Sequence, residues 1–409
     1  MRSIRLPSAL PWCSPILAWL AIGCASAPPP APAAPPTLVQ MQTQIVSPSI
    51  DGTERELFTR GERALLAQKW REAADAFETL LAANPDPVLV PTATFNLGLA
   101  YEGLDLRTKA RDRYHEVAAK NPTTSLARTA LLRALAVHAY LEEWKELGET
   151  ASVFLARTDI DPVDRLTGLG ARGLSKVELG DDASAAVDVQ NGLDIVDELH
   201  YGSGGRLLPP GAQLRFAQAE IRRVRSEKIH FVPDDIPAAA AVPPDFLPKM
   251  EARCQGLLDA QGSYADTMRS TDPHWIAMAG FRVGEMYRKL HHDLMIIPPT
   301  LLAKTDKQKQ IFFAIMHVRY RVLLEKGLEM MKRTLELGEK QLDSSAWVRR
   351  AQASRVDIEL AIEEERAVLK TFPFTEEEIQ GALDILKAKA EKKRVADEKA
   401  LVAREHPKR

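Results

Sequence analysis

Residues 57–85 run LFTRGERALLAQKWREAADAFETLLAANP, and residues 94–122 run TFNLGLAYEGLDLRTKARDRYHEVAAKNP. Each stretch has a glycine near its start, an alanine in its second half, an aromatic residue four positions after that alanine, and a proline at its end. These residues are Gly61, Ala73, Phe77 and Pro85 in the first copy, and Gly98, Ala110, Tyr114 and Pro122 in the second. The two glycines are 37 residues apart, so the chain contains an internal repeat.

The repeated positions are those at which two antiparallel helices touch and stop. A small residue at a helix crossing lets the backbones approach, and a large side chain on the facing helix fills the groove. Apolar residues from Trp70 to Leu80 recur at steps of three and four, which is the period of an amphipathic helix. Proline cannot continue a helix, so Asn-Pro ends each copy. The stretch therefore predicts two consecutive helix-turn-helix units.

This pattern resembles the tetratricopeptide repeat (TPR), which carries a small residue and an aromatic on its first helix, Ala and Phe or Tyr on its second, and Pro at its end. Tyr101 supplies the first-helix aromatic of the second copy, whereas the first copy has Ala64 instead. The spacing of 37 exceeds the family's 34, and the connection at residues 85–91 can hold the excess. The resemblance covers about a sixth of the chain. The alternative is a helical bundle with fortuitous spacing.

The resemblance implies an all-α, TPR-like solenoid that binds protein partners in a concave groove lined by the first helices of the repeats. The polar candidates for partner binding in this groove are Arg60, Asn96 and Glu102. Asn96 is the most telling, because in this family a position such as the one before Leu97 often carries an Asn that holds a ligand backbone. The alternative is that these are ordinary solvated residues.

Length and composition agree with a helical protein of more than one packed unit. The chain has 409 residues, of which 45% are hydrophobic and 27% charged, an ordinary composition for a soluble protein. No alternation of Val, Ile and Thr is sustained, which favours an all-α fold. The formal net charge of -2 gives no electrostatic reason to expect a nucleic-acid partner.

Residues 1–24 predict an export signal, with Arg2 and Arg5 ahead of an apolar run at residues 15–22 that is too short to span a bilayer durably. The run ends in LAIGC, residues 20–24, which resembles the lipobox of bacterial lipoproteins, although Ala21 stands where Leu is most usual. The resemblance implies that Cys24 carries acyl chains such as palmitate, which are enough for stable anchoring. The alternative is a plain secretory signal with an incidental cysteine.

Residues 25–50 predict a tether between this anchor and the folded part. The run APPPAPAAPP at residues 27–36 cannot form a helix and favours an extended polyproline spacer. Ala25, rather than Asp, follows Cys24, which by the sorting habit of Gram-negative lipoproteins indicates the outer membrane. We therefore expect a lipid-anchored protein that faces the periplasm.

The remaining chain divides into four expected parts: a TPR solenoid at 51–232, a Pro/Ala-rich connection at 233–248, a C-terminal helical module at 249–372, and a charged helix or tail at 373–409. Within the solenoid, residues from Leu131 to Phe154 predict a third pair without the diagnostic glycine. Gly173 and Ala185 predict a fourth pair at the family's spacing. The number of repeats after residue 122 stays open.

The C-terminal half carries longer helical patterns. Residues 306–342 contain no proline and predict one arm of a long hairpin with residues 347–370. Thr375 and Glu378 predict a capping box for a last helix with Ile379 and Leu383 on its apolar face. Residues 387–409 hold nine Lys or Arg against four Asp or Glu, a basic tail that suits anionic lipid or cell-wall polymer, or else a solvated terminal helix.

The stretch WIAMAGFRVGEMY, residues 275–287, is similar to a segment of TPR lipoproteins of myxobacteria, some of which serve envelope-spanning gliding complexes. This second resemblance is short. It implies an envelope assembly, and motility as one process that such an assembly serves.

No catalytic pattern accompanies the repeats, since the sequence lacks a G-x-S-x-G elbow, a phosphate-binding loop and a dinucleotide fingerprint. His274, His291 and His292 are the only local histidine cluster, and none are spaced i, i+4, so we expect no metal and no cofactor. Cys254 has no expected partner and is interpreted as a small buried hydrophobe. The chain is therefore not expected to be an enzyme.

Two functions remain in view. The first is a non-catalytic scaffold, anchored to the outer membrane, that holds proteins of a periplasmic assembly in the solenoid groove. The alternative is an accessory lipoprotein of cell-wall metabolism that binds peptidoglycan or regulates a peptidoglycan enzyme. The sequence does not identify the partner or the oligomeric state.

Overall fold

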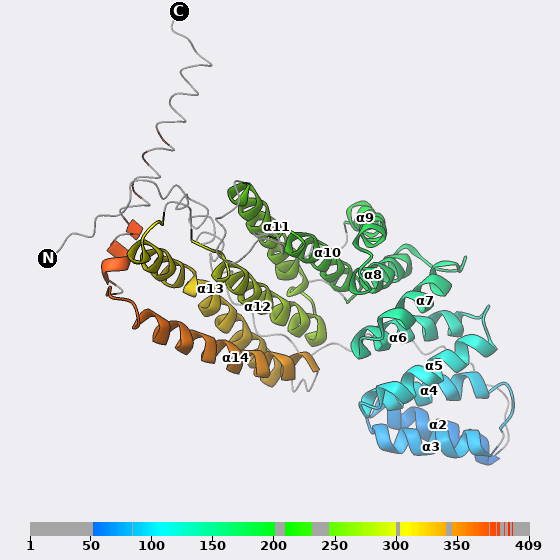
Figure 1. Cartoon of the computed structure of the whole chain (residues 1–409). Helices are drawn as coiled ribbons and strands as arrows, with labels where there is room; N and C mark the ends of the chain where they lie inside the picture. Colours follow the sequence, from blue (N-terminus) through cyan, green and yellow to red (C-terminus); the bar gives the residue numbers. More distant parts are fainter. Residues whose placement is uncertain are drawn as a thin grey trace, which may run out of the picture. The chain divides into compact units, whose positions relative to one another are not determined.

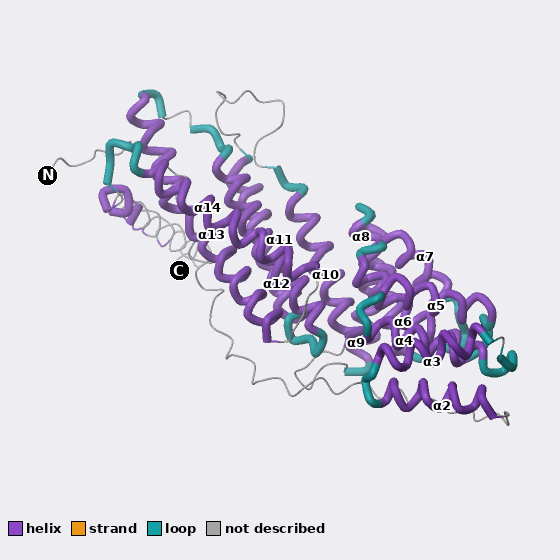
Figure 2. Tube along the Cα trace, turned by 90° about the horizontal axis from the view of Figure 1, so that it is seen from below, coloured by secondary structure: helices purple, strands orange, loops and turns teal. Residues whose placement is uncertain are grey.

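The computed structural model describes residues 52–83, 85–200, 209–230, 245–299, 303–340, 346–375 and 377–381, with a few single positions up to residue 395. All regular structure within these ranges is helical, and no strand is present in them (Figures 1 and 2). The expected all-α fold is therefore confirmed. None of the helices in these ranges combines the length and the apolar character needed to cross a membrane.

Eight helices follow one another as four antiparallel pairs, coloured blue to green in Figure 1. The pairs are α2 (Gly52–Leu66) with α3 (Trp70–Ala82), α4 (Val90–Gly103) with α5 (Arg107–Lys120), α6 (Ser125–Leu141) with α7 (Trp144–Leu155), and α8 (Pro162–Glu178) with α9 (Asp182–Glu198). Each helix packs on the next one along the chain, and the first helices of neighbouring pairs also touch. The third and fourth pairs expected from the sequence are both present.

Short polar turns and side-chain caps set the helix starts after the second pair. The Thr124 hydroxyl accepts a hydrogen bond from the Ala127 amide at 3.1 Å, so α6 begins directly after the Asn121-Pro122 stop. Asp161 and Asp181 cap α8 and α9 in the same way. Helix α6 ends at Glu142, which adopts a left-handed conformation with φ 60°. These turns hold the paired helices antiparallel.

The core of the first two pairs continues into the third. Buried side chains of α2 to α5 form one cluster, and Ala130, Ala134 and Val137 of α6 belong to it. Since neighbouring pairs share this cluster, each pair buries apolar surface that it could not cover alone. The first three pairs are therefore joined by one continuous core rather than standing as separate hairpins.

The chain divides into two compact units by its internal contacts. One unit runs to Ile221 and includes Ala265–Trp275; the other comprises Arg222–Tyr264 and Ile276–Arg409. The division falls inside α10 (Pro209–Glu227), eleven residues ahead of the end expected for the solenoid at residue 232. Each unit is described by itself below.

In the first unit, the fourth pair is closed by the N-terminal part of α10. Leu214 lies directly against Gly170 and Gly192, where a Cβ would meet its atoms at 3.3 Å and 2.6 Å. Segment 265–275 packs through aromatic rings: His274 stacks on Tyr140 of α6 with ring centroids 4.5 Å apart. These contacts add a covering layer that the repeat pattern does not contain.

The second unit contains α11 (Phe246–Thr267) up to Tyr264, α12 (Pro273–Met295) from Ile276 onward, α13 (Asp306–Lys340) and α14 (Ala346–Leu369). Helices α13 and α14 pack along each other, which confirms the long hairpin. Gly280 and Gly284 of α12 lie where Thr334 and Met331 of α13 approach closest. Residues 275–287 thus contain a close helix crossing.

The last helix begins as its capping box predicts. The Glu378 amide donates to the Thr375 hydroxyl at 3.2 Å, and the Thr375 amide donates to the Glu378 carboxylate at 3.0 Å. Ile379 and Leu383 are buried in one cluster with Ile311 and Ile315 of α13. The apolar face of this helix therefore docks on the hairpin.

Several sequence-based expectations fall outside the described residues. These are the signal at 1–24 with Cys24, the tether at 25–50, most of the connection at 233–248, and most of the tail after residue 384. They stay predictions.

Candidate functional site

The crossing inside each of the first two pairs joins a glycine and an aromatic ring. A Cβ placed on Gly61 would lie 2.6 Å from the Phe77 ring, and one on Gly98 would lie 2.6 Å from the Tyr114 ring. Such distances are too short for a side chain, so any residue larger than glycine would displace the ring at either position. Both rings are fully buried, as are Ala73 and Ala110. Pro85 is buried beside the first pair.

The tyrosine hydroxyls of the second pair are bonded to carboxylates inside the stack. Tyr114 donates to Glu102 at 2.5 Å, and Tyr101 donates to Glu78 at 2.6 Å. Burial is the main cause that raises the pKa of Tyr101 to about 12 and the pKa of Tyr114 further. Arg133 of α6 also pairs with Glu102, at 3.5 Å. Glu102, a candidate for partner binding, is therefore already bonded to Tyr114 and Arg133 of the same chain.

Asn96 was expected to face the solvent and hold a ligand backbone, but the structure places it in the interior. Its side chain is 1% exposed, and neither its amide nitrogen nor its amide oxygen has a hydrogen-bond partner. The buried residues of α4 run without a break from Ala93 to Gly98, so more than one face of the helix is covered. A partner cannot reach Asn96 in this packing. Arg60, on the first turns of α2, is exposed and remains accessible.

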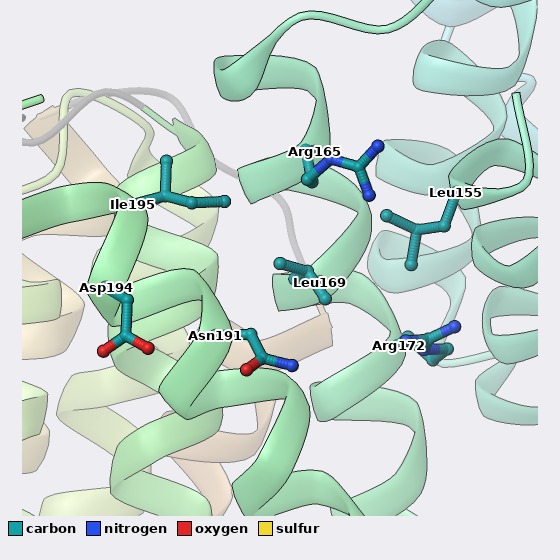
Figure 3. A pocket seen from close by; sticks show the side chains of 7 residues that line it. All are labelled: Leu155, Arg165, Leu169, Arg172, Asn191, Asp194 and Ile195. Carbon is teal, nitrogen blue, oxygen red and sulfur yellow. The ribbon is translucent and has the colours of Figure 1, made fainter. Parts of the chain in front are cut away.

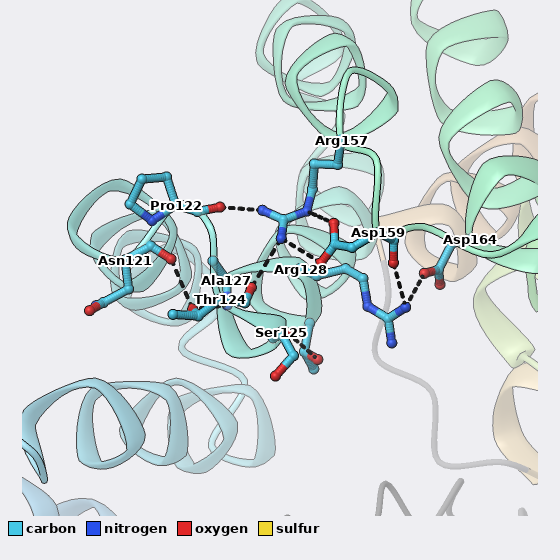
Figure 4. Close-up of polar contacts among 10 residues, drawn as sticks. Asn121, Pro122, Thr124, Ser125, Ala127, Arg128, Arg157, Asp159 and Asp164 are labelled. Carbon is cyan, nitrogen blue, oxygen red and sulfur yellow. Dashed lines mark hydrogen bonds and ion pairs between the residues drawn. The ribbon is translucent and has the colours of Figure 1, made fainter.

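A polar bracket joins the loops at one edge of the stack (Figure 4). Arg157, just after α7, donates to the carbonyl oxygens of Pro122 and Thr124 and to the carboxylate of Asp159. Arg128 of α6 donates to the Asp159 carbonyl at 3.0 Å and pairs with Asp164 of α8. The bracket therefore ties the second, third and fourth pairs, and Pro122 contributes its carbonyl as well as its helix stop.

A pocket of about 450 Å³ opens between the third and fourth pairs (Figure 3). Its apolar lining comes from Leu155, Leu169 and Ile195, and its polar lining from Arg165, Arg172, Asn191 and Asp194. Helix α8 brings Arg165, Leu169 and Arg172 to one face, because residues three and four apart lie side by side on a helix. The pocket is large enough for an aliphatic side chain and its neighbouring backbone.

The charged side chains around this pocket differ in whether they are already bonded within the protein. Arg172 is bonded to the buried carboxylate of Asp188, at 2.6 Å and 2.9 Å. Asp194 accepts a hydrogen bond from Gln190 at 2.8 Å. Arg165 is exposed at the rim, where Figure 3 shows its guanidinium near Leu155. An incoming group would therefore meet an apolar floor beside an accessible guanidinium.

The stacked pairs are TPR-like. No protein-family model matches the chain, and no curated protein matches it. Among solved structures, the chain is similar to a tetratricopeptide repeat protein from Parabacteroides merdae, with 12% sequence identity and a TM-score of 0.38. That likeness covers 73% of this chain and 98% of the other. Stacked helix pairs of this kind present extended surfaces on which other proteins bind.

The histidines and the cysteine occupy packed positions. Cys254 is buried, and burial raises the pKa of its thiol to about 11, as expected for a small hydrophobe. The sequence cluster of His274, His291 and His292 does not converge: His291 and His317 instead flank the buried carboxylate of Glu365. Among the residues that the structure describes, no three His, Cys, Asp or Glu side chains are placed to hold a metal ion.

Proposed function

We propose that this chain is a lipid-anchored scaffold at the periplasmic face of the outer membrane, where it binds proteins of an envelope assembly. The observation that supports the proposal is the row of TPR-like pairs, in which the repeated glycines and aromatic rings are packed between the helices of a pair. The outward surface of the pairs is left for other proteins. The short resemblance at residues 275–287 makes a motility complex one candidate for the assembly.

The pocket between the third and fourth pairs supports a specific contact on this scaffold. Its floor of Leu155, Leu169 and Ile195 removes an aliphatic side chain from water, which contributes about 1.5–3 kcal/mol. The exposed guanidinium of Arg165 favours a carboxylate beside that side chain. Arg60, on the first pair, provides a separate charged position. Asn96 and Glu102 are excluded from the proposed contact surface, because one is buried and the other is bonded to Tyr114.

The proposed anchor rests on Cys24, and a single substitution tests it. Cys24→Ser removes the thiol to which acyl chains attach, so the variant should leave the membrane fraction while keeping its helicity. Fractionation of cell envelopes after a high-salt wash measures this. If the variant stays in the membrane pellet, lipid on Cys24 is not the anchor.

Partner binding is tested by capture from detergent-solubilised envelope. Leu169→Asp and Arg165→Glu should each reduce recovery of a specific partner, whereas Val163→Asp, at an exposed position near the start of α8, should not. Circular dichroism checks that all three variants are folded. Equal recovery by all variants would place the contact elsewhere on the scaffold.

A second experiment distinguishes the scaffold from the alternative function in cell-wall metabolism. Sedimentation of the full chain with purified peptidoglycan, measured against a chain that lacks residues 387–409, tests the cell-wall reading of the basic tail. Co-sedimentation that depends on the tail, together with no recovered protein partner, would favour an accessory role in cell-wall metabolism.

A further inference from the structure

The outward side of α14 carries an apolar line of residues. Helix α14 packs on α13 (Figure 1) through a face that includes the buried Ile358 and Ile362. Val356 and Leu360 are each two residues from Ile358, or about 200° around the helix, and they are 42% and 57% exposed. Ala353 is exposed one turn before them on the same side. Single exposed apolar residues are common, but a line of them indicates a surface that another molecule covers.

The two ends of this line carry opposite charges. Arg349 is exposed at the N-terminal end, and Glu363 and Glu364 are exposed at the C-terminal end. Between them Arg355 and Glu359 pair with each other at 3.6 Å, so their charges are balanced within the helix. The outward charge therefore runs from positive to negative along α14. We define the α14 stripe as Arg349, Ala353, Val356, Leu360, Glu363 and Glu364.

A second α14 that runs in the opposite direction matches both the charge and the shape of the stripe. With a two-fold axis just after Val356, each residue before the axis faces the residue at the same distance after it. Arg349 then lies opposite Glu364 of the second copy, and Ala353 lies opposite Leu360. Opposite charges attract, and a small residue leaves room for a large one. A parallel copy would instead place Arg349 against Arg349.

We propose that a second copy of this chain binds the α14 stripe as an antiparallel, two-fold partner. In a two-fold interface one surface serves both copies, so each contact between opposite positions occurs twice. The apolar residues contribute the attraction, and the charges at the two ends set the direction and the register. One pair of helices buries less surface than the interface of a permanent dimer. We therefore expect reversible association, with a dissociation constant on the order of micromolar.

Cysteine cross-linking tests the direction and the register. Val356→Cys lies beside the proposed axis, so its two copies should form a disulfide-linked dimer when the full chain is oxidised in detergent. Arg349→Cys is the matched control, because in the antiparallel pair its two copies lie about 22 Å apart along the helix axis. The wild type shows the background from the native cysteines, of which Cys254 is buried. Non-reducing gel electrophoresis measures the dimer fraction.

Sedimentation equilibrium of the full chain in density-matched detergent tests the contacts. Arg349→Glu should raise the dissociation constant by at least about 10-fold, because like charges then face each other twice, and adding Glu364→Arg should restore it. Leu360→Asp should abolish the association. Val368→Asp is the matched control, since Val368 is also exposed but lies about 80° around the helix from Leu360. Circular dichroism shows that each variant is folded.

Four results would contradict the proposal. A wild type that stays monomeric at about 100 µM would overturn the self-association and leave the stripe to a different protein. Cross-linking through Arg349→Cys in place of Val356→Cys would overturn the antiparallel direction. Failure of the double charge reversal to restore association would overturn the pairing of Arg349 with Glu364. Equal losses in Leu360→Asp and Val368→Asp would move the contact off the stripe.

Discussion

The second and third helix pairs have the same shape but are packed with opposite choices of side chain. In the second pair a glycine on the first helix faces an aromatic ring sixteen positions later, Gly98 and Tyr114. In the third pair the positions at the same spacing are Leu135 and Ala151, both fully buried. At this spacing the third pair therefore carries a large residue on its first helix and a small one on its second.

The third pair also relies on contacts beyond its own two helices. Tyr140 of α6 is covered by the His274 ring on one side and by the Arg107 guanidinium, 3.4 Å from the ring centroid. Arg157 and Arg128 bracket its loops. The third pair, which lacks the motif, is thus held also by residues distant in sequence.

The largest expected effect compares the small residue of each crossing. Ala110→Glu in the second pair and Ala151→Glu in the third should each lower the free energy of unfolding by about 3–5 kcal/mol. Both alanines are fully buried, so each substitution places an unpaired carboxylate inside the protein. Ala119→Glu, at an exposed position of α5, should change stability by less than about 0.5 kcal/mol. Urea unfolding measures all three. A tolerant Ala151→Glu would show that the third pair is not packed as the second is.

The next effect concerns the stack on Tyr140. Burial lowers the pKa of His274 from 6.5 to about 3, so the unfolded chain takes up a proton first as the pH falls. The folded state should therefore lose stability as the pH falls from 6.5 toward 3, by a few kcal/mol at pH 4.5. His274→Phe keeps a ring against Tyr140 and removes this loss. Unfolding curves at pH 7 and 4.5 measure the difference; parallel losses in both proteins would contradict it.

Glycine at the second crossing should matter by a smaller amount. Gly98→Ala places a Cβ 2.6 Å from the Tyr114 ring, and the displacement should cost about 1–3 kcal/mol. Gly262→Ala in α11 is the control, because nothing lies within 4 Å of its Cβ and alanine favours a helix by up to about 1 kcal/mol. Thermal unfolding should move in opposite directions for the two variants. If Gly98→Ala stabilised the protein, the inferred close approach of Gly98 and Tyr114 would be wrong.

The smallest expected effect is loss of the bracket. Arg157→Ala removes hydrogen bonds to Pro122, Thr124 and Asp159, and should cost about 1 kcal/mol because the site is partly open to water. Arg63→Ala, on the exposed side of α2, should cost nothing measurable. Hydrogen exchange sharpens the result: protection should fall at the start of α6 and α8. Unchanged protection there would mean that the third pair does not depend on the bracket.

The sequence was informative where the interaction lies within one pair. Gly61, Gly98 and their aromatic partners recur at one spacing, so two copies were enough to predict the packing and the all-α fold. The third pair was recognised only by its apolar periodicity, because Leu135 stands where the first two pairs have glycine. The capping box of Thr375 and Glu378 was predicted correctly, since its two residues are three positions apart.

The candidate site was predicted less well, for a physical reason. Asn96 was assigned to a solvent face from its place beside Leu97, but both neighbouring first helices cover α4, and periodicity on one helix does not report its neighbours. The pocket and the Arg157 bracket join residues from different helices, in most cases more than twenty positions apart. No local pattern connects such residues.

The buried phenols of the second pair give the protein an optical signal of its own opening. A tyrosinate absorbs at longer wavelength than a phenol, and Tyr101 and Tyr114 resist ionisation while they donate to Glu78 and Glu102. In an alkaline titration these two should ionise only when the helices separate, so a late, hysteretic rise in ultraviolet absorbance would accompany the opening of the second pair.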